Sequence, residues 1–345
     1  MKKNTFLLSL ILLVLFTFYG CGGNPSQTAP SDVAAKVIDS VVTVFVDNEQ
    51  TDAQVSMGSG VCIRDGGYIV TNYHVIYSAL SNDNLSISIY LNGQKSTGYD
   101  AEILWSNSNL DVAILKCEKN DIPYVKAIDR VINNQNKLRL LEPVIAIGTP
   151  IDFAYQNSCT YGYVSGLDRY TLSARSGLLS QNVYEDLIQH TASISNGNSG
   201  GGLFDLNGNL IGLNTLGSDS GNEMYFAVPI YPVLLVLDKV IENYNTNQQY
   251  VLPTIGISVI DSTICDIYNY DYINDNGLYV TLVENNDGNF QVGDVIISIS
   301  HDVFTYKIDC RNDLIYALMQ LSSGQQVTVN LYRNNVVQSV NIVLN

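Results

Sequence analysis

Short β-prone runs, separated by Gly, Asn and Asp residues, dominate this 345-residue chain after its first forty positions. Strands this short and this closely spaced predict an antiparallel barrel or sandwich rather than βαβ units. The clearest runs lie at 41–46, 60–63, 68–71, 85–90, 112–115, 144–147, 203–204 and 210–213. We therefore expect a mostly β fold.

Two stretches with helical spacing interrupt the strands. Apolar residues recur every three to four positions at 229–244, which predicts an amphipathic helix, and a polar stretch follows at 243–249. A second β-rich region begins at 251 and contains one further helical stretch at 312–321. Because a domain spans roughly 100–200 residues, we expect two domains, at 33–246 and at 247–345.

The first twenty residues have the pattern of an export signal. A cationic start, Met-Lys-Lys, precedes an apolar run at 6–19 that is too short to span a hydrocarbon core of about 30 Å. The run ends in Gly20-Cys21, which resembles the bacterial lipoprotein signal. In that pathway residues 1–20 are removed, Cys21 is lipidated, and 21–32 form a tether. An ordinary signal peptide or anchor with an incidental cysteine is the alternative.

The charge balance limits the partners of the chain. It carries 33 acidic and 17 basic residues, a formal charge of −16. Nucleic-acid affinity comes mainly from Lys and Arg contacts to phosphates, so we expect no nucleic-acid partner. The same surface does not attract anionic lipids, so membrane attachment is expected through the lipid anchor. The expected location is the bacterial cell envelope, at its periplasmic or extracellular face.

The five remaining cysteines form no Cys-x-x-Cys pair, so neither a zinc site nor a disulfide framework is indicated. Cys62 and Cys117 lie in apolar strand-like runs and are expected to be buried free thiols. No Gly-Lys-Ser/Thr follows the glycine-rich run at 197–202, so it is not a phosphate-binding loop. The sequence thus predicts neither metal nor cofactor.

Three separate segments carry residues suited to acyl transfer. His74 follows an apolar strand, Asp111 precedes another, and Ser199 lies in a run of glycines. Attack of a hydroxyl on a carbonyl needs a base, an acid that orients the base, and N–H groups directed at the oxyanion. Each segment alone is typical of packing, a turn or a loop. Their order in one β-rich domain favours a catalytic triad.

The motifs around these residues resemble the chymotrypsin-like serine proteases of the HtrA/Deg family. They are Gly-Ser-Gly-Val at 58–61, Thr-Asn-Tyr-His-Val at 71–75, Asp-Val-Ala-Ile-Leu-Lys at 111–116, Gly-Asn-Ser-Gly-Gly at 197–201 and Leu-Asn-Gly-Asn-Leu-Ile-Gly-Leu-Asn-Thr at 206–215. The resemblance covers about 33–345. It implies a double six-stranded β-barrel, with the active site in the cleft between the barrels, followed by a PDZ domain.

The resemblance implies a role for each matching residue. His74 is expected to be the general base, Asp111 to orient it, and Ser199 to be the nucleophile. The N–H groups of Gly197 and Ser199 are expected to form the oxyanion hole.

The resemblance also implies a primary specificity pocket, for which ordinary strand packing is the alternative. Ser193 occupies the position of the aspartate of trypsin-like enzymes, so cleavage after small or medium apolar residues is expected. His190 stands in a segment where the family usually has Thr-Asp-Ala, and we expect it to be structural. The expected pocket residues are Thr191, Ala192, Ser193, Ile194, Leu213, Asn214 and Thr215.

The second domain resembles a PDZ module. Ile255, Gly256 and Ile257 match its carboxylate-binding loop, where a peptide C-terminus adds as a further strand. A docking or oligomer-stabilising β-domain is the alternative. The stretches 170–186 and 214–223 match the sensor and activation loops of the family.

The resemblance implies an ATP-independent serine endopeptidase that acts on misfolded or unfolded envelope proteins. It further implies peptide C-termini as PDZ ligands and a homo-oligomer, a trimer or a multiple of trimers. The alternative is a catalytically weak, chaperone-like peptide-binding protein. Retention of His74, Asp111 and Ser199 favours the enzyme.

Overall fold

The computed structural model describes residues 28–345, apart from 49, 52, 95, 132–136, 174–181, 218–223, 262–276 and 285–287. The expected signal segment, the tether up to residue 27 and the lipidation site Cys21 lie outside the described residues. Residues 174–181 of the expected sensor loop and 218–223 of the expected activation loop lie outside them as well. Among the described residues, no helix has the length and apolar character needed to cross a bilayer.

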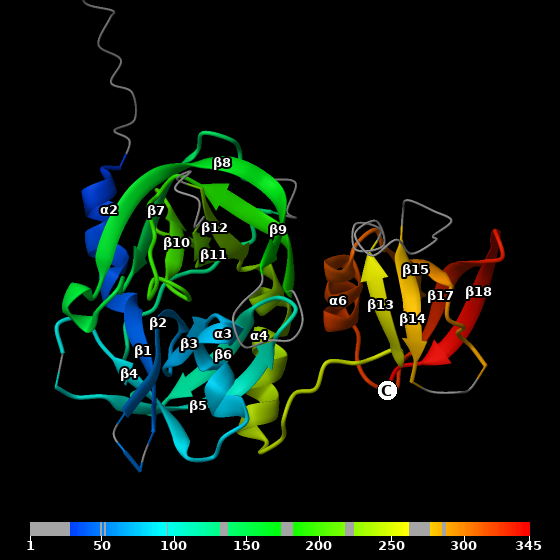
Figure 1. Ribbon diagram of the computed structural model, residues 1–345, viewed down its shortest axis with the longest axis horizontal. Coiled ribbons are helices and arrows are strands. Elements are labelled where there is room, and N and C mark those ends of the chain that lie inside the picture. Colours follow the sequence, from blue (N-terminus) through cyan, green and yellow to red (C-terminus); the bar gives the residue numbers. More distant parts are fainter. Residues whose placement is uncertain are drawn as a thin grey trace, which may run out of the picture.

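The first six strands form a closed antiparallel barrel in the order β1-β2-β3-β6-β5-β4 (Figure 1). Val42, Val44 and Ile89 fill its interior with other buried aliphatic side chains, since alternate residues of each strand face inward. The strands are β1 (Val41–Asn48), β2 (Ala53–Arg64), β3 (Tyr68–Thr71), β4 (Leu85–Tyr90), β5 (Tyr99–Asn107) and β6 (Val112–Cys117).

The next six strands close a second barrel in the order β10-β11-β12-β9-β8-β7. Its strands are β7 (Pro143–Gly148), β8 (Ser158–Ser173), β9 (Asn182–His190), β10 (Gly202–Asp205), β11 (Leu210–Gly217) and β12 (Tyr225–Pro229). The short helical turn η3 (Phe153–Tyr155) connects β7 to β8. The predicted mostly β fold, with two six-stranded barrels, is confirmed.

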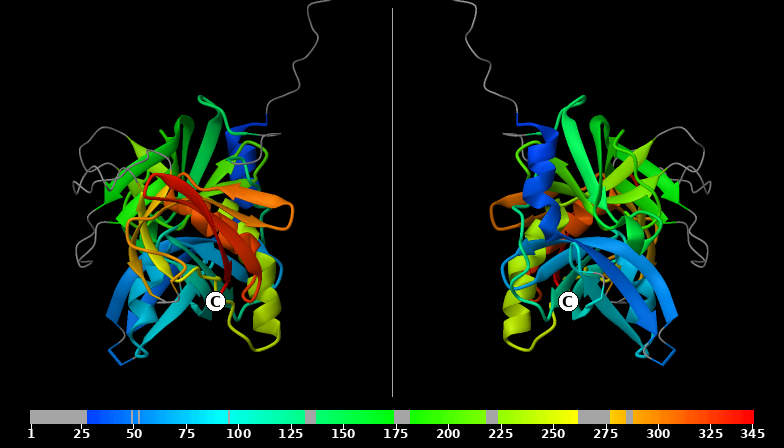
Figure 2. Two further views of the ribbon diagram at one scale, coloured as in Figure 1. Left: turned by 90° about the vertical axis from the view of Figure 1, so that its right-hand side faces the viewer. Right: turned by 90° about the vertical axis from the view of Figure 1, so that its left-hand side faces the viewer.

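Two helices pack on the outside of the barrels, as the side views in Figure 2 show. Helix α2 (Pro30–Val37) precedes β1, and α4 (Tyr231–Asn245) follows β12, close to the predicted span of 229–244. Val233, Leu237 and Val240 of α4 belong to one large apolar cluster with side chains of both barrels. Helix α4 therefore joins the two barrels into one unit.

The C-terminal region forms a separate sheet with one helix. Its strands pair in the order β13-β14-β15-β17-β18, and β16 pairs with β15. Helix α6 (Arg311–Gln320) covers the sheet near the predicted span of 312–321. The strands are β13 (Ile257–Asp261), β14 (Leu278–Val283), β15 (Val295–His301), β16 (Phe304–Lys307), β17 (Gln326–Arg333) and β18 (Val336–Val343). The domain limits at 246 and 247 stay a prediction.

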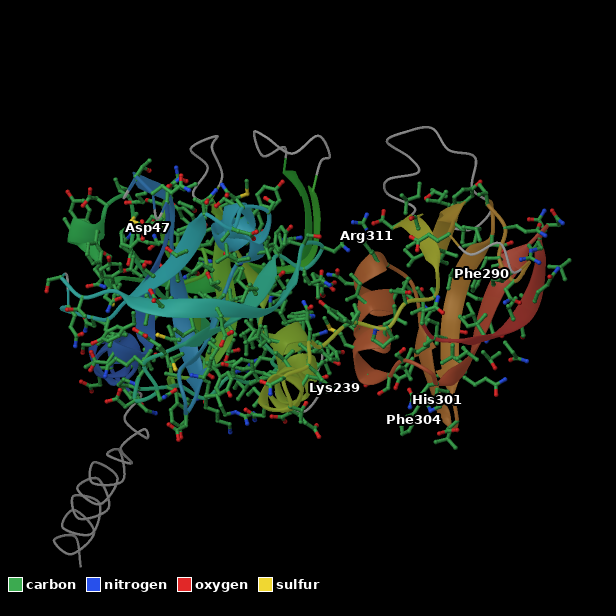
Figure 3. All side chains as sticks on the ribbon, turned by 90° about the horizontal axis from the view of Figure 1, so that it is seen from below. Asp47, Lys239, Phe290, His301, Phe304 and Arg311 are labelled. Carbon is green, nitrogen blue, oxygen red and sulfur yellow. The ribbon has the colours of Figure 1, made fainter. Side chains whose placement is uncertain are left out.

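Helix α6 contacts both parts of the molecule. The ring of Tyr316 lies edge-on to that of Tyr231 on α4, with centroids 5.3 Å apart. Lys239 of α4 donates from Nζ to the carbonyls of Met319 (2.8 Å) and Leu321 (3.1 Å) at the C-terminal end of α6. Figure 3 shows Lys239 on the side of α4 that faces α6. A cation at this end of a helix satisfies carbonyls that lack an intrahelical partner.

Candidate active site

His74 lies shortly after the end of β3, in the short helix α3 (Tyr73–Ile76). Asn72, which precedes this helix, is buried, and its side-chain amide donates to the main-chain carbonyl of Asp111 (2.9 Å). The main-chain N–H of His74 donates to Oδ1 of Asp111 (3.0 Å). These two contacts hold the start of α3 against Asp111, the residue that the sequence predicts to orient His74.

Asp111 occupies a tight turn immediately before β6. Its φ of 52° lies in the left-handed region, which Asp tolerates better than most residues. The side-chain oxygen of Asn107 accepts hydrogen bonds from the main-chain N–H groups of Asn109 (3.0 Å) and Leu110 (3.1 Å). This arrangement is an Asx-type turn, and it directs the Asp111 side chain toward His74.

The carboxylate of Asp111 is 2% exposed, and each of its oxygens lies 2.9 Å from Nδ1 of His74. Its Oδ2 also accepts a hydrogen bond from the hydroxyl of Thr215 (2.8 Å). A carboxylate in this position keeps the imidazole proton on Nδ1 and leaves Nε2 able to accept a proton. Burial, together with smaller contributions from Tyr77 and the Asp111 charge, raises the pKa of the neighbouring Tyr73.

Ser199 lies in the loop between β9 and β10, on the second barrel. Its hydroxyl donates to the main-chain carbonyl of Thr215 (3.2 Å), and among the described residues this is its only hydrogen bond. Thr215 therefore contacts both Asp111 and Ser199. Sequence reasoning placed Thr215 in the specificity pocket and missed this contact, because the pairing of β11 with its neighbours positions it.

The main chain around Ser199 is held by the first barrel and lies against the residue that follows β7. Ser59 of β2 donates from its hydroxyl to the carbonyl of Gly197 (2.8 Å) and from its N–H to the carbonyl of Ser199 (2.8 Å). The φ of Gly197 is 94°, and a Cβ there would lie 2.2 Å from the carbonyl oxygen of Thr149, so only glycine fits. The Gly-Ser-Gly motif at 58–60 is visible in the sequence, but nothing in the sequence indicates these contacts of Ser59.

The N–H groups of Gly197 and Ser199 make no hydrogen bond within the described part of the chain. Two unpaired main-chain N–H groups beside a nucleophilic hydroxyl are the groups that stabilise an oxyanion. The site thus combines an imidazole held by a buried carboxylate, a hydroxyl, and two free donors. Chemically, this set can carry out acyl transfer.

The residues expected to form the specificity pocket lie in two environments. Leu213, Asn214 and Thr215 are buried on β11, and Leu213 belongs to the large apolar cluster beneath α4. Thr191 and Ser193 are exposed, Ala192 is buried, and Ile194 is half-buried. Their role in substrate selection stays a prediction.

A polar contact that the sequence did not indicate lies beside Ser193. Its hydroxyl donates to the phenolic oxygen of Tyr225 on β12 (2.9 Å). The Tyr225 ring stacks on His190, with centroids 6.2 Å apart. Burial lowers the pKa of His190 to about 4, with weaker opposing contributions from the main chain of Ala192 and Phe226. His190 is therefore a neutral, buried ring at neutral pH.

The residues expected to bind a peptide C-terminus lie where the second domain begins. Ile255 is buried in the core of that domain, and Gly256 has a φ of 69°. Ile257 starts β13, which pairs with β14 and is an edge strand of its sheet. An edge strand offers free main-chain groups to a further strand. Binding of a peptide here stays a prediction.

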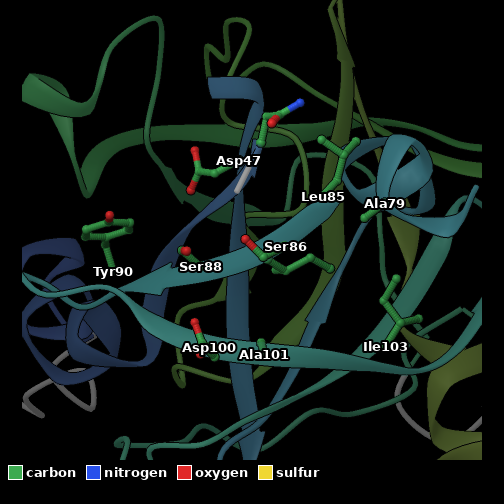
Figure 4. A pocket seen from close by; sticks show the side chains of 11 residues that line it. Asp47, Ala79, Leu85, Ser86, Ser88, Tyr90, Asp100, Ala101 and Ile103 are labelled. Atoms are coloured by element: carbon green, nitrogen blue, oxygen red, sulfur yellow. The ribbon is translucent and has the colours of Figure 1, made fainter. Parts of the chain in front are cut away.

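A hollow on the first barrel lies apart from this site. An open hollow of about 810 Å³ lies over β4 and β5 on the first barrel, with Ser86, Ser88 and Asp100 among its lining residues (Figure 4). It does not include His74 or Asp111. The described residues contain no group of three His, Cys, Asp or Glu side chains arranged to hold a metal ion.

The four cysteines in the described part of the chain are free thiols. Cys62 and Cys117 are buried, as the sequence predicted, and burial raises the pKa of Cys62 to about 12. Cys159 is exposed.

Two family models match the chain: a trypsin-like peptidase domain at residues 58–213 and a PDZ domain at residues 253–344. Among curated proteins, the chain is 28% identical over 353 positions to the serine protease Do-like HtrB of Bacillus subtilis, covering 92% of this chain and 72% of that protein. It is 30% identical to a probable periplasmic serine endoprotease, DegP-like, of Bartonella henselae, covering 84% of this chain and 53% of that protein. The chain thus spans about half the length of the DegP-like relatives.

Solved structures share the fold. A serine endoprotease from Yersinia pestis superposes with a TM-score of 0.62 at 24% identity, covering 92% of this chain and 98% of that one. The HtrA-type protease AlgW with a tripeptide superposes with a TM-score of 0.65 at 24% identity, covering 92% and 97%. At this identity, the likeness supports the double barrel and the PDZ-like domain.

Proposed function

Because this chain belongs to the HtrA/Deg-type serine proteases, with a trypsin-like peptidase domain followed by one PDZ domain, we propose that it hydrolyses peptide bonds through Ser199, His74 and Asp111. The observation that carries this proposal is the position of His74 Nδ1, which lies 2.9 Å from both oxygens of the buried Asp111 carboxylate. A buried carboxylate bonded to one ring nitrogen makes the other nitrogen a base.

In the proposed reaction, His74 Nε2 takes the proton of Ser199 as Oγ attacks the carbonyl carbon of the scissile bond. The carbonyl oxygen becomes an oxyanion that accepts hydrogen bonds from the N–H groups of Gly197 and Ser199. When the C–N bond breaks, the imidazolium returns the proton to the leaving amine. Water then attacks the acyl-enzyme with the same imidazole as base, and Ser199 regains its proton.

One rotation precedes this reaction. The Ser199 hydroxyl donates to the Thr215 carbonyl (3.2 Å), so it has to rotate away from this acceptor before it can donate to His74. A hydroxyl rotamer changes on a fast timescale compared with typical turnover. The resting bond to Thr215 is therefore compatible with catalysis.

We propose unfolded or misfolded envelope proteins as substrates and peptide C-termini as ligands of the edge strand β13. Curated relatives described as periplasmic endoproteases support an envelope location. Independence of ATP, lipidation of Cys21 and assembly into trimers or multiples of trimers belong to the same proposal. We propose that the chain cleaves after small or medium apolar residues. Ser193 provides no negative charge that could pair with a cationic side chain of the substrate.

The test is hydrolysis of an unfolded protein such as reduced casein, with no nucleotide present, by the full chain and by Ser199→Ala. We expect cleavage by the wild-type chain and none by the variant. A chain that suppresses aggregation of an unfolded protein but cleaves nothing, with or without C-terminal peptides, would instead be a peptide-binding protein.

A further inference from the structure

A three-residue turn beside the Ser199 loop has an unusual conformation. Ile151 has a φ of 65°, and the N–H of Asp152 donates to the carbonyl of Pro150 (2.6 Å), which makes Ile151 the centre of a γ-turn. A β-branched residue rarely adopts a positive φ, because its Cβ crowds the main chain. The Ile151 side chain is 71% exposed, so packing of that side chain does not explain the conformation.

The preceding residue anchors the turn to the first barrel. Thr149 is buried, and its hydroxyl lies 2.8 Å from that of Thr43 on β1. The main-chain N–H of Thr149 donates to the hydroxyl of Ser59 (2.9 Å), the same hydroxyl that holds the Gly197 carbonyl. The chain therefore enters the turn in a fixed direction.

The following residues anchor the turn on its other side. At the start of η3, Oδ1 of Asp152 accepts a hydrogen bond from the N–H of Ala154 (2.7 Å). The main-chain carbonyl of Asp152 accepts one from the N–H of Tyr155 (2.9 Å). Gln156 donates from its side chain to the carbonyls of Tyr90 (3.2 Å) and Leu91 (3.1 Å) on the first barrel. Ile151 is thus confined between two anchored segments, which is the situation in which strained main chain persists.

The turn directs one N–H group at the Ser199 loop. The N–H of Ile151 donates to the carbonyl of Asn196 (2.6 Å). In a trans peptide the carbonyl of one residue and the N–H of the next point in opposite directions. The bond to Ile151 therefore turns the N–H of Gly197 away from the γ-turn and leaves it free.

We infer that Ile151 is a positioning residue for the oxyanion hole: its main-chain N–H holds the Asn196 carbonyl so that the N–H of Gly197 stays available to the oxyanion. Among the described residues, this is the only hydrogen bond made by the 196–197 peptide group. The contacts from Ser59 act on the carbonyls of Gly197 and Ser199, which belong to later peptide groups. Without Ile151, the 196–197 peptide is free to rotate and to present its carbonyl instead. The inference rests on the proposed peptidase function.

The test removes the N–H of Ile151. Ile151→Pro lacks the donor and restricts φ to about −65°. Replacing Ile151 by its α-hydroxy acid through nonsense suppression keeps the side chain and replaces the N–H by an oxygen. Leu141→Pro is the matched control, because Leu141 also has a positive φ (63°), is 78% exposed and donates its N–H to a carbonyl, that of Val164 (2.8 Å).

Each variant is measured for kcat and KM on a peptide substrate, for affinity to a peptidyl boronic acid, and for its thermal midpoint. Loss of one oxyanion-hole donor lowers kcat about 100-fold or more. We expect this loss in both Ile151 variants, with KM changed less than about threefold and boronic acid affinity falling in parallel with kcat/KM. The thermal midpoint shows whether each variant is folded. If proline prevents folding, the hydroxy acid variant alone tests the role of the Ile151 N–H.

Retention of kcat within about fivefold by the folded hydroxy acid variant would overturn the inference. An equal loss of kcat in Leu141→Pro would also overturn it, since the effect would then come from any strained exposed position of the second barrel. A wild-type chain that hydrolyses nothing would overturn the proposed function itself, and that result is visible before any variant is compared.

Discussion

The side-chain hydroxyl of Thr215 lies 2.8 Å from Oδ2 of Asp111. The two residues come from different barrels, β11 of the second and the turn before β6 of the first. The main-chain carbonyl of Thr215 also accepts the hydroxyl of Ser199. One residue thus connects the acid of the first barrel to the serine of the second, and the relative position of the barrels controls the site.

Thr215→Val is expected to weaken the site while preserving its shape. Valine replaces the hydroxyl with a methyl group, so Asp111 loses one donor and the carboxylate is less firmly oriented. A hydrogen bond to a charged group contributes about 1.5–3 kcal/mol, so kcat/KM should fall about tenfold or more. Thr215→Ser keeps the hydroxyl and serves as the control. Equal kcat/KM in the valine variant and the wild type would contradict a role for this contact.

Asp111→Asn is expected to reduce turnover strongly without unfolding the protein. The amide resembles the carboxylate in size but can donate to Nδ1, which favours the tautomer that carries its proton on Nε2. An imidazole in that form cannot accept the serine proton, and kcat should fall about 10³–10⁴-fold. Steady-state kinetics beside a thermal unfolding curve checks this. A loss below about tenfold in a folded variant would remove Asp111 from the proposed triad.

Stability is expected to fall in mild acid because of His190. Burial lowers its pKa to about 4, while an unfolded histidine titrates near 6.5, so the unfolded state binds more protons between these values. The free energy of unfolding therefore decreases as pH falls from about 6.5 toward 4, by about 3 kcal/mol from this residue.

His190→Phe supplies the comparison, because it keeps a ring against Tyr225 and cannot titrate. Urea unfolding at about pH 7.5 and about pH 4.5 should give a smaller loss of stability in the variant than in the wild type. Identical losses in both proteins would show that other groups account for the acid sensitivity.

The contact between α4 and α6 is expected to depend on Lys239. Its Nζ donates to two carbonyls at the end of α6, and burial lowers its pKa. Lys239→Ala leaves these carbonyls without that donor, so amide hydrogen exchange along α6 should accelerate. Lys307→Ala, at an exposed position of the same domain, is the control. Equal exchange in both variants and the wild type would contradict the contact in solution.

Several of the helices and strands could be predicted because local patterns specify them. The apolar period at 229–244 and the runs at 41–46 and 112–115 reflect packing of neighbouring residues, and α4, β1 and β6 lie there. The motifs around His74, Asp111 and Ser199 predict a catalytic triad. In the structure His74 contacts Asp111, and Thr215 contacts both Asp111 and Ser199. The catalytic role of the three residues stays a prediction.

The remaining features depend on distant contacts. The sequence Thr-Pro-Ile-Asp at 149–152 contains no glycine to indicate a positive φ, and the conformation of Ile151 follows from anchors on the first barrel. The double function of Ser59, and the docking of α6 on α4, likewise require that two remote segments meet. The pattern of apolar and polar residues along the chain does not indicate such contacts between distant segments.

The most direct measurement of the central claim is the site of modification by a fluorophosphonate. The probe phosphonylates a serine only when a base removes its proton, so the full chain is treated with it, digested and analysed by mass spectrometry. The account predicts one adduct, on the peptide that contains Ser199, and its loss in folded His74→Ala. A folded wild-type chain without this adduct, or an undiminished adduct in His74→Ala, would contradict it.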